Sequence, residues 1–189
     1  MRNRTESINA ILHNPLDYLH THRGSLPSLF TAANVRSRLN RIVLHGLGLS
    51  PVDARQIKRD QWTALWMANW KRLPTVALLM GAQLMWPQLA RGARISELEP
   101  SVRAFARADV GPRSLVCAPG DGDLEQSIRA LGLGVLAAWD SYIPAAFMQR
   151  LPLLFAPRVV ELQQALPAQE PNASLFLLAV QHARLHQNA

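Results

Sequence analysis

The sequence predicts a mostly α-helical fold, a single compact multi-helix domain over residues 1–189 with little or no β-structure. The helix formers Ala, Leu, Arg and Gln dominate the composition, whereas the strand-favouring residues Tyr, Thr and Ile are sparse. Thirteen prolines and ten glycines divide the chain into segments of helical length. Apolar residues make up 49% of the chain and charged residues 17%, which indicates a packed core rather than a disordered chain.

The first half of the chain contains a series of helical segments, preceded by a flexible start over residues 1–13. Asn14 and Pro15 predict the cap and first residue of a short turn, because proline needs no amide partner at that position. Pro74 ends the helix expected over 51–72, because its ring clashes with the preceding turn. The expected segments are a turn over 14–20, a loop over 22–27, and helices over 28–45 (with Val35, Leu39, Ile42 and Val43 on one face), 51–72 and 75–89, the last being the central buried helix.

The second half of the chain predicts shorter helices and one brief strand. Asp123 is placed to cap a helix, although Gly132 and Gly134 weaken that prediction because glycine disfavours helix interiors. The expected segments are helices over 97–108, 124–139, 144–150, 159–166 and 171–186, and a strand over 114–118.

Trp62, Trp66 and Trp70 recur every four residues, so on a helix they lie within a stripe about 80° wide. Such a stripe indicates either a partner-binding face, because tryptophan is enriched at interface hot spots, or core packing. Core packing is favoured for Trp66 and Trp70. Trp62, nearer the polar start of the helix, is the better candidate for an interface.

The chain carries a formal net charge of +7 and a pI of about 10.9, almost entirely from arginine, since Lys58 and Lys71 are its only lysines. This charge indicates either an anionic partner (nucleic acid, lipid or an acidic protein) or solvated helix faces in a basic proteome. The arginines form no block of five or more, which argues against a basic nucleic-acid-binding tail.

The sequence predicts no catalytic, cofactor or metal site, and therefore no enzyme. Cys117 lies near Asp121 and Asp123, whose carboxylates would oppose formation of the nucleophilic thiolate. His182 and His186 share a helix face at a spacing that suits a metal, but no cysteine or acidic ligand is near them in sequence. Solvated histidines on the last helix are the favoured interpretation.

The chain is expected in the cytoplasm. Its start shows no apolar stretch like a signal-peptide core, and its longest strongly apolar window, residues 73–86, is shorter than the ~20 residues that a membrane span needs. If the protein works at a membrane, another component holds it there.

Three segments together resemble one family, the SctK adaptors of type III secretion sorting platforms, and most closely its branch containing OrgA and MxiK. After His20 comes Thr21, where the family pattern is expected to have a proline. The positions that carry the resemblance are Pro15, Tyr18 and His20 in segment 14–20, Trp66, Trp70, Arg72, Leu73 and Pro74 in segment 65–74, and Pro152, Leu153, Leu154, Phe155 and Pro157 in segment 149–157.

The resemblance implies a helical adaptor without catalytic activity at the cytoplasmic face of the inner membrane. Such an adaptor links the cytoplasmic domain of an SctD-like inner-membrane ring protein to an SctQ-like pod protein. Through the pod protein it connects indirectly to an SctL-like stator and an SctN-like ATPase, and it is needed for substrate sorting and secretion. No nucleic-acid partner and no direct membrane insertion are expected.

Two alternatives remain open at the level of sequence: a basic helical nucleic-acid-binding protein and a small enzyme. For the adaptor, the positive charge indicates at least one contact with an acidic surface, where arginine makes bidentate bonds to carboxylates. The candidate partner contacts are Arg36, Arg38, Arg41, Trp62, Lys71 and Arg72.

Overall fold

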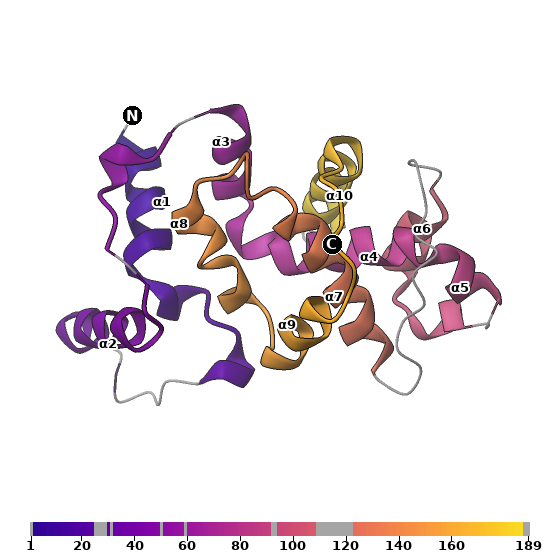
Figure 1. Ribbon diagram of the computed structural model, residues 1–189, viewed down its shortest axis with the longest axis horizontal. Helices are drawn as coiled ribbons and strands as arrows, with labels where there is room; N and C mark the ends of the chain where they lie inside the picture. Colours follow the sequence, from indigo (N-terminus) through magenta and orange to yellow (C-terminus); the bar gives the residue numbers. More distant parts are fainter. Residues whose placement is uncertain are drawn as a thin grey trace. The chain divides into compact units, whose positions relative to one another are not determined.

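The computed structural model describes residues 2–24, 30, 32–49, 51–58, 60–91, 94–108 and 123–186, with side chains from Glu6 onward. These residues form α-helices and short 3₁₀ helices joined by turns, and none of them lies in a β-strand (Figure 1). The mostly α-helical prediction is therefore confirmed. The strand expected over 114–118 lies outside the described residues.

The chain forms two compact units, and each brings together segments that are distant in sequence. Unit 1 comprises Met1–Lys71 and Asp140–Pro157, and unit 2 comprises Arg72–Trp139 and Arg158–Ala189. The single domain over 1–189 stays a prediction. No helix in the described part of the chain is long and apolar enough to cross a membrane.

Unit 1 is built around the first helix, which contacts most of the other elements of this unit. Residues 1–13, expected as a flexible start, contain this helix instead, because Ile8, Ile11 and Leu12 lie on one face and are buried. The helices of the unit are α1 (Arg2–His13), η1 (Pro15–Asp17), η2 (Thr21–Arg23), α2 (Ala33–Gly46), η4 (Ala54–Gln56), α3 (Gln61–Ala68), α8 (Ala145–Met148) and η7 (Leu151–Leu154); η5 (Trp70–Arg72) spans the boundary with unit 2.

The helix expected over 51–72 is shorter in the structure, where α3 begins only at Gln61. Asp60 is its cap, since the carboxylate accepts a hydrogen bond of 2.8 Å from the Thr63 amide. At the other end, the Asn69 side chain donates to the Leu65 carbonyl at 2.7 Å. The prediction was wrong because Asp53, taken as part of the long helix, instead caps the separate turn η4.

Unit 2 is organised around α4, which packs against α7, α6 and α10. Nine of its twelve residues are buried, which confirms the prediction of a central helix. The helix expected over 75–89 is divided in two, because Pro87 follows the end of α4 and occupies the first turn of the next helix. The helices of this unit are α4 (Leu73–Leu84), α5 (Trp86–Arg91), η6 (Arg94–Glu97), α6 (Pro100–Arg107), α7 (Leu124–Ala137), α9 (Pro157–Gln164, which starts on the last residue of unit 1) and α10 (Ala173–His186).

The contact between α4 and α7 is made by backbone against backbone. A Cβ atom added to Gly81 would overlap the carbonyl oxygen of Ile128, and one added to Gly132 would overlap that of Ala77. Gly132 was expected to weaken α7, yet α7 forms, with the Asp123 carboxylate accepting from the Glu125 amide at 3.0 Å. Close packing against α4 offsets the low helix propensity of glycine.

We predict that Gly81→Ala and Gly132→Ala each lower the free energy of unfolding by about 3 kcal/mol or more, because only a shift of both helices relieves the overlap with a backbone oxygen. Gly46→Ala is the matched control: a Cβ there meets nothing within 4 Å, and the change should be neutral or stabilising by about 0.5 kcal/mol. Urea unfolding monitored by circular dichroism measures all three. Equal midpoints for Gly81→Ala and Gly46→Ala would contradict the packing described here.

Candidate partner-binding surfaces

The three segments singled out in the sequence meet inside unit 1. The His20 amide donates to the Leu153 carbonyl at 2.9 Å, which joins the first segment to the third. The Trp70 ring lies edge-on to Tyr18, with centroids 5.6 Å apart, and 5.8 Å from the ring of Phe147 in α8. The second segment therefore contacts the first directly and leads into unit 2 through its last residues, Arg72 to Pro74.

Most positions of these segments are buried. Trp66 is fully buried and Trp70 is 4% exposed, which confirms core packing for both tryptophans. His20, Arg72, Pro74, Pro152 and Pro157 are half-buried. The segments therefore form packed structure, and packing alone accounts for their pattern. The buried positions are Pro15, Tyr18, Trp66, Trp70, Leu73, Leu153, Leu154 and Phe155.

Arg150 is a fully buried cation that sequence reasoning did not select. Its Nε donates to the Leu12 carbonyl at 3.1 Å and its Nη1 to the Ala146 carbonyl at 2.9 Å, so it connects the end of α1 to α8. Burial lowers the pKa of Arg150 and raises that of Tyr18, whose hydroxyl donates to the Ile11 carbonyl at 2.7 Å. One sequence signal was present: Arg150 directly precedes the apolar run 151–156.

The inward face of α2 is polar. Asn40 alone among the residues of this fully described helix is buried; its Oδ1 accepts from the Leu16 amide at 3.1 Å, and its Nδ2 donates to the Asn14 side chain at 3.3 Å. Arg36 forms an ion pair of 2.6 Å with Asp17, so this candidate contact is engaged within unit 1. The sequence places Ile42 on one face with Val35, Leu39 and Val43, and of these four residues Ile42 is 64% exposed whereas the other three are half-buried.

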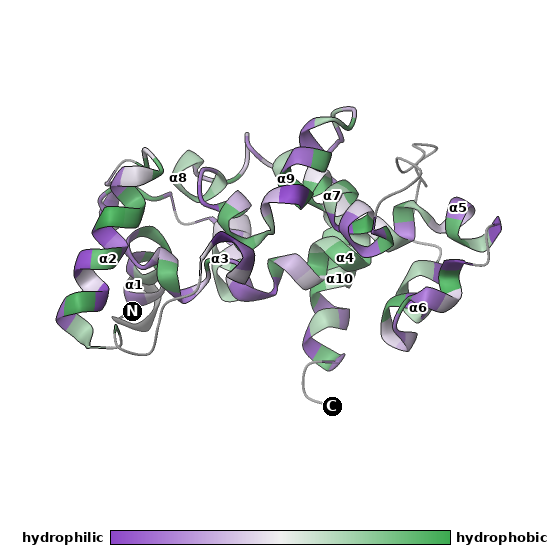
Figure 2. Ribbon diagram, turned by 90° about the horizontal axis from the view of Figure 1, so that it is seen from below, coloured by the Kyte–Doolittle hydropathy of each residue, from purple (hydrophilic) through white to green (hydrophobic). Residues whose placement is uncertain are grey.

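The outward face of α2 consists of Arg38, Arg41, Ile42 and His45, all exposed. Their spacing of i, i+3, i+4 and i+7 places them in one stripe along the helix. They border a shallow hollow of about 760 Å³. Figure 2 shows that both hydrophobic and hydrophilic residues contribute to α2. An exposed isoleucine beside two exposed arginines forms a surface with both an apolar and a cationic component.

The positive charge of the chain is concentrated in unit 1. This unit holds 11 of the 20 Lys and Arg residues but 5 of the 13 Asp and Glu residues, a formal net charge of +6. Unit 2 holds the other 9 cations and 8 anions and has a formal net charge of +1. An electrostatic contact with an acidic surface is therefore favoured at unit 1.

The remaining candidate contacts lie near the boundary between the units in sequence. Trp62 and Arg72 are half-buried, and Lys71 is exposed. Their role in partner binding stays a prediction.

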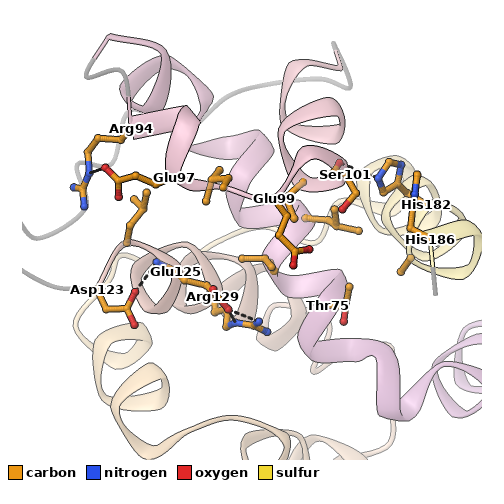
Figure 3. Close-up of a pocket in the computed structure, with 16 residues that line it drawn as sticks. Thr75, Arg94, Glu97, Glu99, Ser101, Asp123, Glu125, Arg129, His182 and His186 are labelled. Carbon is orange, nitrogen blue, oxygen red and sulfur yellow. Dashed lines mark hydrogen bonds and ion pairs between the residues drawn. The ribbon is translucent and has the colours of Figure 1, made fainter. Parts of the chain in front are cut away.

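Unit 2 contains a polar pocket of about 630 Å³ between α4, α6, α7 and α10 (Figure 3). Its charged groups largely pair with one another: Arg94 lies 3.5 Å from Glu97, and Arg129 lies 2.5 Å from Glu125. Arg129 also donates to the Pro74 carbonyl at 3.1 Å. The two ion pairs lie within η6 and within α7, and the bond to Pro74 joins α7 to α4, so Arg129 has a structural role.

The two histidines at the edge of this pocket stack on each other, with ring centroids 4.3 Å apart. Nε2 of His182 lies 3.0 Å from the Ser101 carbonyl, and its ring packs on Phe105 at 5.1 Å. Burial lowers the pKa of His182, so the ring is neutral at neutral pH and donates to that carbonyl. Within the described residues, no group of three or more His, Cys, Asp or Glu side chains is placed to hold a metal ion; Cys117 and Asp121 lie outside them.

Comparison with known proteins decides the family. Residues 8–185 match the model of the OrgA/MxiK family, described as a bacterial type III secretion apparatus protein. The chain belongs to this family. It is 29% identical to the oxygen-regulated invasion protein OrgA of Salmonella typhimurium, over 94% of this chain and 87% of OrgA. It is 26% identical to the protein MxiK of Shigella flexneri, over 94% of this chain and 88% of MxiK. No solved structure matches the chain.

The OrgA/MxiK match extends from α1 to α10. It begins at Ile8, which is buried in α1, and ends at Leu185, in the last turn of α10. It covers most of both units. The resemblance in the three segments is thereby confirmed at the level of the whole chain.

We predict that Arg150→Met lowers the free energy of unfolding of this OrgA/MxiK protein by about 2–3 kcal/mol, because the buried carbonyls of Leu12 and Ala146 lose their donor. Arg158→Met removes an arginine whose side chain is 64% exposed, and should change stability by less than about 0.5 kcal/mol. Thermal unfolding of both variants tests this. A melting temperature of Arg150→Met equal to that of Arg158→Met would show that the buried guanidinium does not stabilise unit 1.

Proposed function

We propose that this OrgA/MxiK protein is a cytoplasmic adaptor of the type III secretion sorting platform. It binds an SctQ-like pod protein and the cytoplasmic domain of an SctD-like inner-membrane ring protein. Through the pod protein it connects to an SctL-like stator and an SctN-like ATPase. It works at the cytoplasmic face of the inner membrane, turns over no substrate, and is needed for substrate sorting and secretion.

The observation that carries this proposal is the family match over residues 8–185. Because the match covers most of both units, the proposed role belongs to the whole chain rather than to one part of it. Two relatives, OrgA of Salmonella typhimurium and MxiK of Shigella flexneri, align over at least 87% of their own length.

The geometry supports two separate protein contacts. An adaptor needs two surfaces of different chemistry, so that each partner is recognised independently. Unit 1 offers exposed arginines on a strongly basic body, and unit 2 is nearly neutral. Arginine suits the basic contact, since its planar guanidinium makes two parallel bonds to one carboxylate.

The proposal is tested by co-purification of the tagged chain with each partner from the same secretion locus, after circular dichroism has shown that the chain is folded. We expect both partners to be retained. Raising the salt concentration should slow association more than it speeds dissociation, because rim charges act mainly on the association rate. Deletion of the gene should abolish secretion of substrates.

Failure of the folded chain to retain either partner would contradict the adaptor function. Retention of duplex DNA that weakens steeply with salt, in the absence of partner binding, would instead support a basic nucleic-acid-binding protein.

A further inference from the structure

We propose that the outward face of α2 binds an acidic amphipathic helix of one partner protein, with an apolar side chain of that helix seated on Ile42 and its carboxylates bonded to Arg38 and Arg41. This inference rests on the proposed adaptor function. It goes further by naming the chemistry of one of the two partner contacts and the residues that make it.

The contacts that hold α2 in place come from the side opposite to the outward face. The helix is fastened by its opposite side, through the hydrogen bonds of Asn40 and the ion pair of Arg36 with Asp17. Arg38 and Arg41 form no ion pair with any residue that the structure describes, although Arg36 on the same helix does. Their charges are thus available to a partner.

The face has the composition of a small protein interface. Interfaces place apolar atoms at the centre and polar groups at the rim, and a few residues contribute most of the binding free energy. Here Ile42, 64% exposed, lies one turn after Arg38 and directly follows Arg41, and His45 comes one turn later. The adjoining hollow of about 760 Å³ gives an incoming side chain room to pack.

The geometry favours a helix as the occupant. Arg38 and His45 are seven residues apart, which is about 10 Å along the axis, or two turns. Side chains at i, i+3, i+4 and i+7 form one face of a helix, and the ridges of that face pack into the grooves of a second helix. A partner helix with an apolar residue flanked by Asp or Glu one turn away on either side complements it.

The positive charge of unit 1, together with the exposed Ile42, favours an acidic protein as the partner over nucleic acid or a membrane. With a formal net charge of +6, unit 1 attracts a carboxylate-rich helix and repels a basic one. Phosphates of nucleic acid would engage the arginines but would leave Ile42 in water. An anionic membrane would need several apolar side chains side by side, and the outward face has one.

The test measures the affinity of variants for the purified cognate pod protein and, separately, for the purified cytoplasmic domain of the cognate ring protein. Two variants change the face: the double reversal Arg38→Glu with Arg41→Glu, and Ile42→Asp. The matched control is Arg55→Glu with Lys58→Glu, which makes the same charge change in unit 1 at side chains that are 88% and 84% exposed. An unchanged melting temperature establishes that each variant is folded.

We expect both α2 variants to bind one of the two partners at least about tenfold more weakly than the wild type, and the other partner as the wild type does. The control should bind both partners like the wild type. Undiminished binding of both partners by the α2 variants would overturn the inference and leave the adaptor function intact. If the wild type itself bound neither partner, the adaptor function would fail instead.

Two further results would also overturn the inference. An equal loss caused by the control variant, or an equal loss of both partners from the α2 variants, would show a general effect of charge rather than a docking face. Binding of a duplex DNA fragment that is abolished by the double reversal on α2, with both proteins still bound, would assign this face to nucleic acid.

Discussion

The direct backbone contact between α4 and α7 is the constraint on which unit 2 depends. Gly81 and Gly132 bring the two helices so close that a methyl group at either position would overlap a peptide oxygen. A rotamer change cannot relieve such an overlap, so the two helices have one register and one separation. The helices α6 and α10 then pack against α4, and the pairs Arg94–Glu97 and Arg129–Glu125 complete the surface around them.

Unit 1 is organised by buried polar side chains rather than by a glycine contact. Arg150, Asn40 and Tyr18 each bond to backbone groups at or near the end of a helix or turn, and so fix where α1, α2 and α8 lie. Buried hydrogen-bonding groups tolerate few alternative arrangements, because any other packing leaves them without partners. One consequence concerns function: by holding Asn40 inward, this network leaves Arg38, Arg41 and Ile42 exposed.

The sequence predicted those features that depend on neighbouring residues. Pro74 correctly marked a boundary between helices and Asp123 the start of α7, because caps and prolines act within one turn. It could not predict features that depend on distant residues. Gly132 taken alone disfavours a helix, because its close contact with Ala77 in α4 cannot be read from the sequence. The side of α2 that faces inward depends on the hydrogen bond between Asn40 and Asn14, which are 26 residues apart. At the candidate site Arg38 and Arg41, which the sequence singled out, are exposed, whereas the exposure of Ile42 and the burial of Arg150 were not predicted.

The central claim is that the three family-like segments form the interior of the chain, and that partner binding uses the outward face of α2. Backbone hydrogen exchange of the chain, alone and in complex with the pod protein or the ring-protein domain, tests it most directly, because binding slows exchange in the elements that it stabilises. The account predicts slower exchange across the second half of α2 in one of the two complexes, with segments 65–71 and 149–157 unchanged. Slower exchange confined to those two segments, with α2 unchanged in both complexes, would contradict it.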